Sequence, residues 1–399
     1  MAKKLILLAM LLSVCFCSCR KEAEKKEVEK KEAEKKSEEQ QTMVAAARDI
    51  AINEANFPDE IFRAYLFRQD YGEDSIITES EIAAITDMIV WEAGIKSLKG
   101  IEHFTALTNL ICSANQLTSL DVSKNTKLVS LNCFYNQLTS LDVSKNTNLQ
   151  QLFCGHNQLT SLDVSKNTVL KKLECGNNQL TSLDVSQNKE LMSLYCGYNP
   201  LTSIEVSENT ELEILGCPEN QLTSLDVSKN TKLMDLNCTY NQLTSLDLSQ
   251  NKKLKVFCCG HNQLTSLDLS QNKELEYLLC NSNQLTSLDL SECPVVRALR
   301  CFGNQIRGEA MDKLIESMPQ HTEDIPTELY ISDMWDSNEG NVCTQVQREA
   351  IKKKGWDIRD SNEEKMKQIR SFCYPMDALP KIRKGFHVAY IPRCFFPHG

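Results

Sequence analysis

Ten cysteines recur at a constant spacing of 21 residues, and thiols are the side chains of this sequence best suited to chemistry. A metal site needs thiols that converge, a disulfide needs suitable Cβ directions, and a redox centre needs an exposed thiolate. One thiol per repeat, in a straight inward row, meets none of these needs. The row is therefore predicted to consist of small buried apolar side chains. Its members are Cys112, Cys133, Cys154, Cys175, Cys196, Cys217, Cys238, Cys259, Cys280 and Cys301.

The cysteines belong to a 21-residue repeat that is clearest over 128–146 and reads L-x-x-L-x-C-x-x-N-x-L-x-x-L. Ten copies without insertion or deletion indicate a solenoid. The five inward aliphatic side chains of one repeat contribute roughly 8–15 kcal/mol on burial. Ordering the backbone of one repeat costs at least about 20 kcal/mol. One repeat therefore cannot fold alone, and its neighbours must cover both of its open faces.

Each repeat is expected to supply one short strand, near Ser130 to Phe134, to a parallel sheet. The return segment T-S-L-D-V-S is too short and too β-branched for a helix, which predicts a thin, non-helical convex side. An asparagine follows each cysteine three residues later, as in Asn115, Asn136 and Asn157. Its amide is expected to hydrogen-bond the backbone of its own and the next coil.

This pattern resembles the leucine-rich repeat, with cysteine in place of the third apolar residue. More narrowly, it is similar to the cysteine-ladder repeats of internalin-J-like bacterial surface proteins. The resemblance covers about residues 85–306 and implies a recognition scaffold. The predicted fold is an α/β solenoid dominated by parallel strands, with ten leucine-rich repeats over 107–306.

The outward strand positions vary between copies, whereas the inward positions barely change. Exposed aromatic side chains on a concave sheet are typical of binding surfaces; drift of unconstrained surface positions is the alternative. His156 and His261 lie five coils apart, about 24 Å, and cannot share a metal ion. The predicted partner-binding residues are Phe134, Tyr135, Phe153, His156, Tyr195, Tyr198, Tyr240, His261, Tyr277 and Phe302.

An acidic residue recurs in the return segment of each repeat, from Asp121 to Asp289. Lysines three residues later, as at Lys124 and Lys145, offset part of this charge. A solvated face is expected, and weak binding of a cation or a partner is the alternative.

Residues 1–19 have the pattern of a signal peptide, because two lysines precede a short apolar run and small residues. The run is too short to span a membrane. The sequence F-C-S-C resembles a lipoprotein signal, which implies that Cys19 is lipidated and holds the protein to a membrane; an ordinary secreted protein is the alternative. Residues 20–41 repeat EAEKK-like units with favourable i,i+4 ion pairs and predict a charged, semi-rigid stalk.

Residues 42–106 are predicted to form a helical N-terminal cap that ends in a degenerate first coil. Thr78 and Glu81 make a capping box for a helix near 79–86. Together with Asp70 and Asp74 they also match four ligand positions of a calcium loop, but another ligand and the turn glycine are replaced. A structural turn is expected here, and a calcium site is the alternative.

Residues 307–360 are predicted to form a βαβ-like C-terminal cap, with helices near 311–318 and 344–354 and strands near 329–331 and 356–358. Residues 361–399 form a tail with seven basic and three acidic residues and no motif. Three cysteines outside the repeats are able to pair outside the cytoplasm, in a connectivity that the sequence does not define: Cys343, Cys373 and Cys394.

The sequence contains no G-x-S-x-G, H-E-x-x-H or P-loop motif, so neither an enzyme nor a cofactor is predicted. The net charge of −10 argues against nucleic acid as a partner. We expect a monomeric, lipid-anchored protein of the cell envelope, at the outer membrane or cell surface. It would bind a protein or glycan through its concave face as a surface adhesin, as the resemblance implies. The alternative is a periplasmic or envelope adaptor that binds the cell's own partners.

Overall fold

The computed structural model describes Lys30, Lys35 and residues 49–322, 326–332 and 339–359. The predicted signal peptide with Cys19, the rest of the stalk, and the tail with Cys373 and Cys394 lie outside the described residues.

The chain divides into two compact units. The N-terminal unit extends to Asp235 and takes in Asn241–Lys252. The C-terminal unit comprises Leu236–Tyr240 and the residues from Lys253 onward. The short strand β10 (Asp235–Asn237) spans the boundary between them in the sequence.

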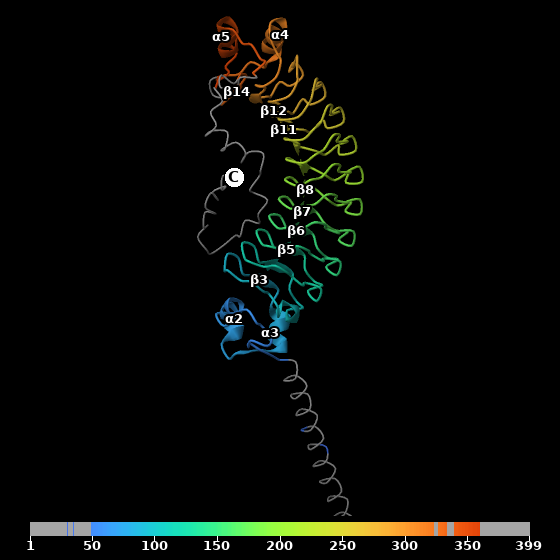
Figure 1. Cartoon of the computed structure of the whole chain (residues 1–399), viewed down its shortest axis with the longest axis vertical. Helices are drawn as coiled ribbons and strands as arrows, with labels where there is room; N and C mark the ends of the chain where they lie inside the picture. Colours follow the sequence, from blue (N-terminus) through green and yellow to red (C-terminus); the bar gives the residue numbers. More distant parts are fainter. Residues whose placement is uncertain (1–29, 31–34, 36–48, 323–325, 333–338, 360–399) are drawn as a thin grey trace, which may run out of the picture. The chain divides into compact units, whose positions relative to one another are not determined.

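In the N-terminal unit the strands of the repeats run parallel and pair in chain order (Figure 1). Leu131 lies opposite Leu152 and Leu152 lies opposite Leu173, so the register advances by one repeat per strand. The predicted strand ends early, at Asn132. The strands are β3 (Asp87–Ile89), β4 (Asn109–Ile111), β5 (Ser130–Asn132), β6 (Gln151–Phe153), β7 (Lys172–Glu174), β8 (Ser193–Tyr195) and β9 (Ile214–Gly216).

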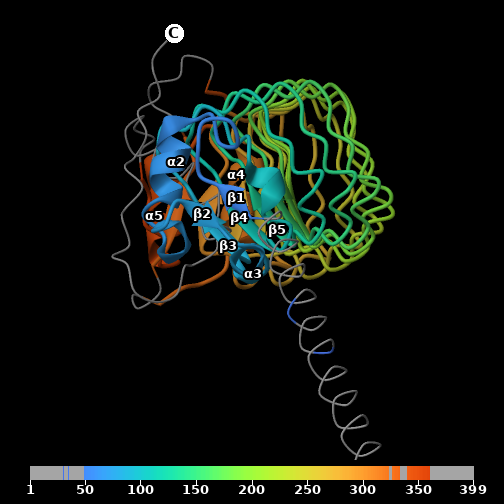
Figure 2. The same ribbon diagram turned by 90° about the horizontal axis from the view of Figure 1, so that it is seen from below.

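The core of this unit is the inside of the coils. Leu128, Leu131, Cys133, Leu138 and Val143 are all 0% exposed, as their spacing predicted. The described return segments between β4 and β9 contain turns and no helix, and they lie across the coil from the strands (Figure 2). The predicted fold class, a solenoid dominated by parallel strands, is confirmed.

The N-terminal cap places a small antiparallel pair and two short helices before the first coil. Asp59 caps α2 by accepting the N–H groups of Ile61 and Phe62, and Phe62 is buried in the cap. The predicted capping box of Thr78 and Glu81 is present at α3. The elements are β1 (Ile50–Ala51), α2 (Glu60–Leu66), η1 (Asp70–Gly72), β2 (Ile76–Ile77), α3 (Glu79–Ala84) and η2 (Ile101–His103).

The C-terminal unit contains a parallel ladder of the same kind and two helices. The predicted second strand of the cap is reduced to a single parallel bridge between Leu329 and Ile358. Thr344 and Gln347 form the predicted capping box of α5. The elements are β11 (Val256–Cys258), β12 (Tyr277–Leu279), β13 (Ala298–Arg300), α4 (Glu309–Ser317), β14 (Glu328–Tyr330) and α5 (Gln345–Lys353).

Candidate binding surface on the strand face

The asparagine that follows each cysteine ties its coil to the preceding one. The Nδ2 group of Asn136 donates to the carbonyls of Cys133, in its own coil, and Cys112, in the preceding coil, each at 3.0 Å. Its Oδ1 accepts a leucine N–H of the preceding coil at 3.0 Å. Asn115 and Asn157 make equivalent bonds. The sequence predicted bonding to the next coil; the bonds go to the preceding coil, since the next coil is joined by its own asparagine.

The residue before each of these asparagines has a left-handed backbone, and so does Glu92 at the corresponding position of the cap coil. In the non-glycine residues of this column φ lies between 51° and 56°, a conformation that costs an ordinary residue roughly 1–2 kcal/mol. The cross-coil bond from the N–H of Tyr135 to the carbonyl of Gly155 is among those that hold it. We call these positions of the N-terminal unit the left-handed column: Glu92, Ala114, Tyr135, His156, Asn177, Tyr198 and Glu219.

We call the outward side chains of β3 to β9, together with those that follow each strand up to the left-handed column, the strand face of the N-terminal unit. Tyr135 is 44% exposed on this face. Seven other predicted binding residues are half-buried: Phe134, His156, Tyr195, Tyr198, Tyr240, His261 and Tyr277. The last three of them belong to the C-terminal unit.

The predicted exposure of Phe153 and Phe302 is wrong, because they are 1% and 5% exposed. Phe153 lies in register between the side chains of Asn132 and Glu174 on the neighbouring strands. The coil that holds Phe302 is crossed by the chain near residue 340, where Glu339 accepts the N–H of Gly303. Both phenylalanine side chains therefore pack against neighbouring residues and offer little surface to a partner.

The strand face also holds two apolar side chains that the repeat pattern did not reveal. Ile89 is 37% exposed and Trp91 is 43% exposed, both in the cap coil that contains β3. They were missed because the cap coil lacks the repeat's marker cysteine and asparagine. Their positions correspond to those of Ile111 and Ser113 in the next coil, since β3 and β4 pair in register.

Glycines leave room for aromatic rings to lie across the next coil. A Cβ on Gly155 would stand 2.7 Å from the ring of Phe134, and a Cβ on Gly216 would stand 2.5 Å from the ring of Tyr195. The rings thus lie flat along the strand face, which explains why they are half-buried.

Tyrosine and histidine also stack on each other in consecutive coils. The rings of Tyr135 and His156 are 4.0 Å apart and nearly parallel. Burial lowers the pKa of His156 to about 4, so this imidazole is neutral at neutral pH. Tyr240 and His261 form a second such stack, also at 4.0 Å, in the C-terminal unit.

The strand face of the N-terminal unit is acidic. Its outward strand positions and its left-handed column contain one lysine, Lys172, and several carboxylates. Burial raises the pKa of Glu174 and that of Asp235 to about 7, so these two groups titrate near neutrality. The carboxylates of this face are Asp87, Glu92, Glu174 and Glu219, whereas Asp235 belongs to β10.

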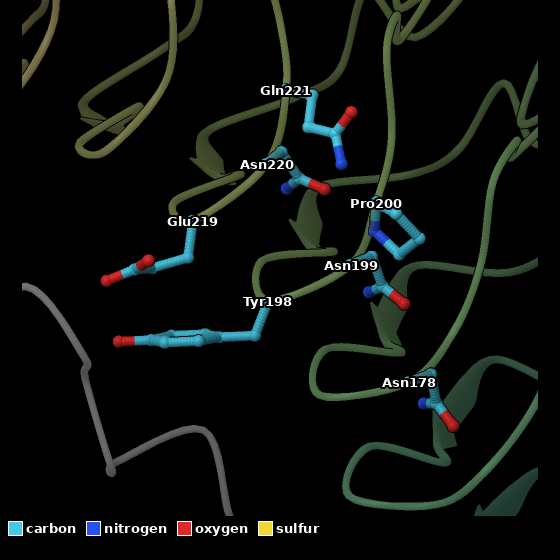
Figure 3. A pocket seen from close by; sticks show the side chains of 7 residues that line it. All are labelled: Asn178, Tyr198, Asn199, Pro200, Glu219, Asn220 and Gln221. Atoms are coloured by element: carbon cyan, nitrogen blue, oxygen red, sulfur yellow. The ribbon is translucent and has the colours of Figure 1, made fainter.

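A hollow of about 400 Å³ opens beside the left-handed column (Figure 3). Tyr198 and Glu219 come from consecutive coils, and their side chains point to the same side of the chain. Pro200 stands where most copies have glutamine, and it lacks the N–H with which Gln221 donates to the preceding coil. The lining residues are Asn178, Tyr198, Asn199, Pro200, Glu219, Asn220 and Gln221.

The cysteine row is inert. Cys112, Cys133 and Cys154 are 0% exposed and carry free thiols. Burial raises the pKa of Cys133 to about 12, and that of Cys112 and Cys154 well above the usual value. Within the described residues no group of three or more His, Cys, Asp or Glu side chains is placed to hold a metal ion.

A second buried asparagine row went unrecognised in the sequence. In Asn188 the Nδ2 group donates to the carbonyls of Val164 and Asn167, at 3.0 and 2.8 Å, while its Oδ1 has no hydrogen-bond donor. Cys293 replaces the last member, and its thiol lies 3.6 Å from the two equivalent carbonyls. The signal in the sequence was the asparagine that recurs in S-K-N, S-Q-N and S-E-N. The row comprises Asn125, Asn146, Asn167, Asn188, Asn209, Asn230, Asn251 and Asn272.

The acidic row of the return segments serves local turns. Asp142 accepts the N–H of Ser144 at 2.8 Å, and this backbone bond lowers the pKa of the carboxyl. Asp163 accepts the N–H of Ser165 in the same way. These carboxylates stabilise their own backbone, in agreement with a solvated structural face.

The segment that matched a calcium loop uses its side chains internally. Asp74 accepts the N–H of Ile76, and Thr78 and Glu81 are engaged in the capping box of α3. Asp70 begins the short helix η1. The serine at the turn-glycine position, Ser75, has φ of 67° and preserves the left-handed turn.

Comparison with known proteins agrees with this architecture. Residues 147–190 match the family model described as Leucine Rich repeats (2 copies). Internalin J of Listeria monocytogenes is 38% identical over 71 residues, which is 18% of this chain and 7% of internalin J. The match thus spans a small part of that relative. No described helix is long and apolar enough to cross a bilayer.

Two solved structures extend the match. The functional domain of internalin J from Listeria monocytogenes, which includes a cysteine ladder, is 34% identical with a TM-score of 0.64, over 71% of this chain and 67% of that one. The internalin InlF of the same species is 22% identical with a TM-score of 0.61, over 77% of this chain and 97% of that one, and shows the shared fold. The chain is therefore a leucine-rich repeat protein with homology to internalin J.

Proposed function

We propose that this protein is a lipid-anchored component of the bacterial cell envelope that binds a protein or glycan partner through the strand face, and that it acts as a surface adhesin. The observation that carries the proposal is the strand face of the N-terminal unit, where Ile89, Trp91 and Tyr135 keep 37–44% of their surface exposed. Solenoids use such extended faces for binding. Exposed aromatic side chains on rigid positions are the usual anchors of interfaces.

The lipid anchor is supported by the leader sequence and by Cys19 at its end. The charged stalk fits a tethered binding module, because EAEKK-like sequences are semi-rigid spacers. The homology to internalin J supports a surface role.

Photo-crosslinking on intact cells tests the binding face. A photoreactive amino acid at position 135 should give adducts with a partner, whereas the same group at position 148 should not. Asn148 is the matched control because it is exposed but lies outside the strand face. Adducts only at position 148 would place the binding site elsewhere.

Protease digestion of the same cells tests the location. We expect the repeats to be degraded on intact cells, and a Cys19→Ala variant to be released from the membrane fraction. Protection of the repeats until the outer envelope is opened would instead favour an internal adaptor.

A further inference from the structure

Trp91 is an exposed aromatic side chain on a fixed backbone. It is 43% exposed. The N–H of Val90, just before it, donates to the carbonyl of Ile111 in the next coil at 2.8 Å. The N–H of Glu92, just after it, donates to the carbonyl of Ser113 at 3.0 Å. Because the backbone is already held on both sides, binding has little to order besides the ring, which is the property of an interface anchor.

The coil next to Trp91 leaves this ring uncovered. Ser113 occupies the position in register with Trp91, and Ala114 follows it, so both neighbouring side chains are small. The equivalent position of the third coil holds Phe134, whose ring lies across Gly155 on the side away from Ser113. We call this exposed apolar surface the Trp91 patch: Ile89, Trp91, Ser113 and Ala114.

The Trp91 patch is bordered by carboxylates. Asp87 and Glu92 are exposed in the same coil as Trp91. Asn109 donates to Asp87 at 3.2 Å, which holds this carboxylate beside the next strand. The strand-face positions described for the first three coils, up to Tyr135, contain no lysine or arginine. A partner with a positive charge next to an apolar side chain would therefore complement the patch.

A polypeptide suits this patch better than a neutral glycan. Carboxylates only accept hydrogen bonds, and a cationic donor binds them more strongly than a neutral hydroxyl group does. Ile89, two residues before Trp91, is 37% exposed and adds aliphatic surface without a polar atom. Sugar rings carry hydroxyl groups around their apolar faces, and burial against this surface would leave those groups without partners.

We propose that Trp91 and Ile89 anchor a large apolar side chain of a partner polypeptide, and that an adjoining lysine or arginine of the partner pairs with Glu92 and Asp87. The inference rests on the proposed binding function and specifies its partner as a protein segment with neighbouring apolar and basic residues.

The test measures the fluorescence anisotropy of three labelled peptides of equal length, titrated with the purified protein. They are a leucine–lysine, a serine–lysine and a leucine–glutamate peptide. The leucine–lysine peptide should bind at least about fivefold more tightly than either of the others. Trp91→Ser should weaken its binding about tenfold, and Glu92→Gln about threefold at low salt.

Ser113→Phe separates a defined anchor from general apolar adhesion. It adds apolar surface, yet it should weaken binding of the leucine–lysine peptide, because the new ring would lie against Trp91. The backbone accepts an aromatic residue here, since Phe134 occupies the equivalent position of the next coil. Tighter binding by this variant would contradict the proposal.

Two variants outside the strand face are the controls. Met192→Ser removes an apolar side chain that is 38% exposed, and Glu190→Gln removes an exposed charge. Each should change binding by less than about twofold. Equal losses in Trp91→Ser and Met192→Ser, or equal binding of the serine–lysine peptide, would overturn the inference.

Neutral oligosaccharides are titrated in the same way. Binding that Trp91→Ser abolishes, without selectivity among the peptides, would overturn the inference and assign the patch to a glycan. Crosslinking at position 135 would still report on the proposed function, so the failure of the inference and that of the function are distinguishable.

Discussion

Asn178→Ala should destabilise the N-terminal unit more than Asn188→Ala, although both residues are asparagines with at most 9% exposure. The difference lies in what each Oδ1 does. That of Asn178 accepts the N–H of Leu159 at 2.9 Å, whereas that of Asn188 has no donor. Alanine at position 178 therefore leaves a buried N–H without its partner, and alanine at position 188 does not.

The magnitudes follow from the bonds that are lost. Each hydrogen bond contributes about 1 kcal/mol, and an orphaned buried group costs about 1–3 kcal/mol. Asn178→Ala removes bonds to the carbonyls of Cys154 and Cys175 and orphans the N–H of Leu159, which gives about 3–5 kcal/mol.

Asn188→Ala removes two bonds to carbonyls that keep backbone donors, since Val164 and Asn167 accept the N–H groups of Asn167 and Leu170. It also removes a buried Oδ1 that lacks a donor. We therefore expect a loss of about 1–2 kcal/mol.

Urea unfolding followed by circular dichroism measures both losses, with m-values compared to check that the same surface unfolds. Asn148→Ala is the control, because Asn148 is exposed and makes one bond of 3.3 Å; it should change stability by less than about 0.5 kcal/mol. Equal losses at positions 178 and 188 would refute the reasoning, since they would mean that the Oδ1 of Asn188 is as well bonded as that of Asn178.

Gly216→Ala should cost about 1–3 kcal/mol because its Cβ would stand 2.5 Å from the ring of Tyr195. In a Tyr195→Ala background the cost should disappear, so a double-mutant cycle in urea measures the contact, and an undiminished cost would contradict it. Glu174→Gln should raise stability at pH 8 but not at pH 4. The folded-state pKa of Glu174, about 7, lies above its ordinary value, so the folded protein holds a proton that the unfolded chain has released, and stability falls as pH rises from about 4.5 to above 7. Urea midpoints of parent and variant at the two pH values check this, and a constant difference would argue against the raised pKa.

The solenoid could be predicted because the 21-residue period determines which side chains of every coil face the interior. Leucines and cysteines that recur at 21 residues must face the same interior, and neither Leu131 nor Cys133 has another place to be buried. The capping boxes at Thr78 and Thr344 were readable for a similar reason: the two partners of each box are three residues apart in the chain.

The strand face could be predicted only in part. Whether an outward ring is exposed depends on the residue at the same position of the next coil. The ring of Phe134 packs against that coil because Gly155 has no side chain there. The left-handed column has a signature in the sequence that was not recognised: its positions hold Tyr, His, Asn, Glu or Ala and never a β-branched residue. Valine, isoleucine and threonine are the residues that this backbone tolerates least.

The bonds between coils join residues at the same few offsets from Asn136 to Asn220, 19 and 24 residues for the asparagine that follows each cysteine. Excision or duplication of one whole repeat within 128–231 therefore leaves every remaining donor opposite an equivalent acceptor. The number of coils can thus change in single genetic steps without a mismatch in these backbone bonds. Duplication or loss of a repeat can therefore lengthen or shorten the strand face, or place two copies of one repeat next to each other. The fold of the remaining coils does not change.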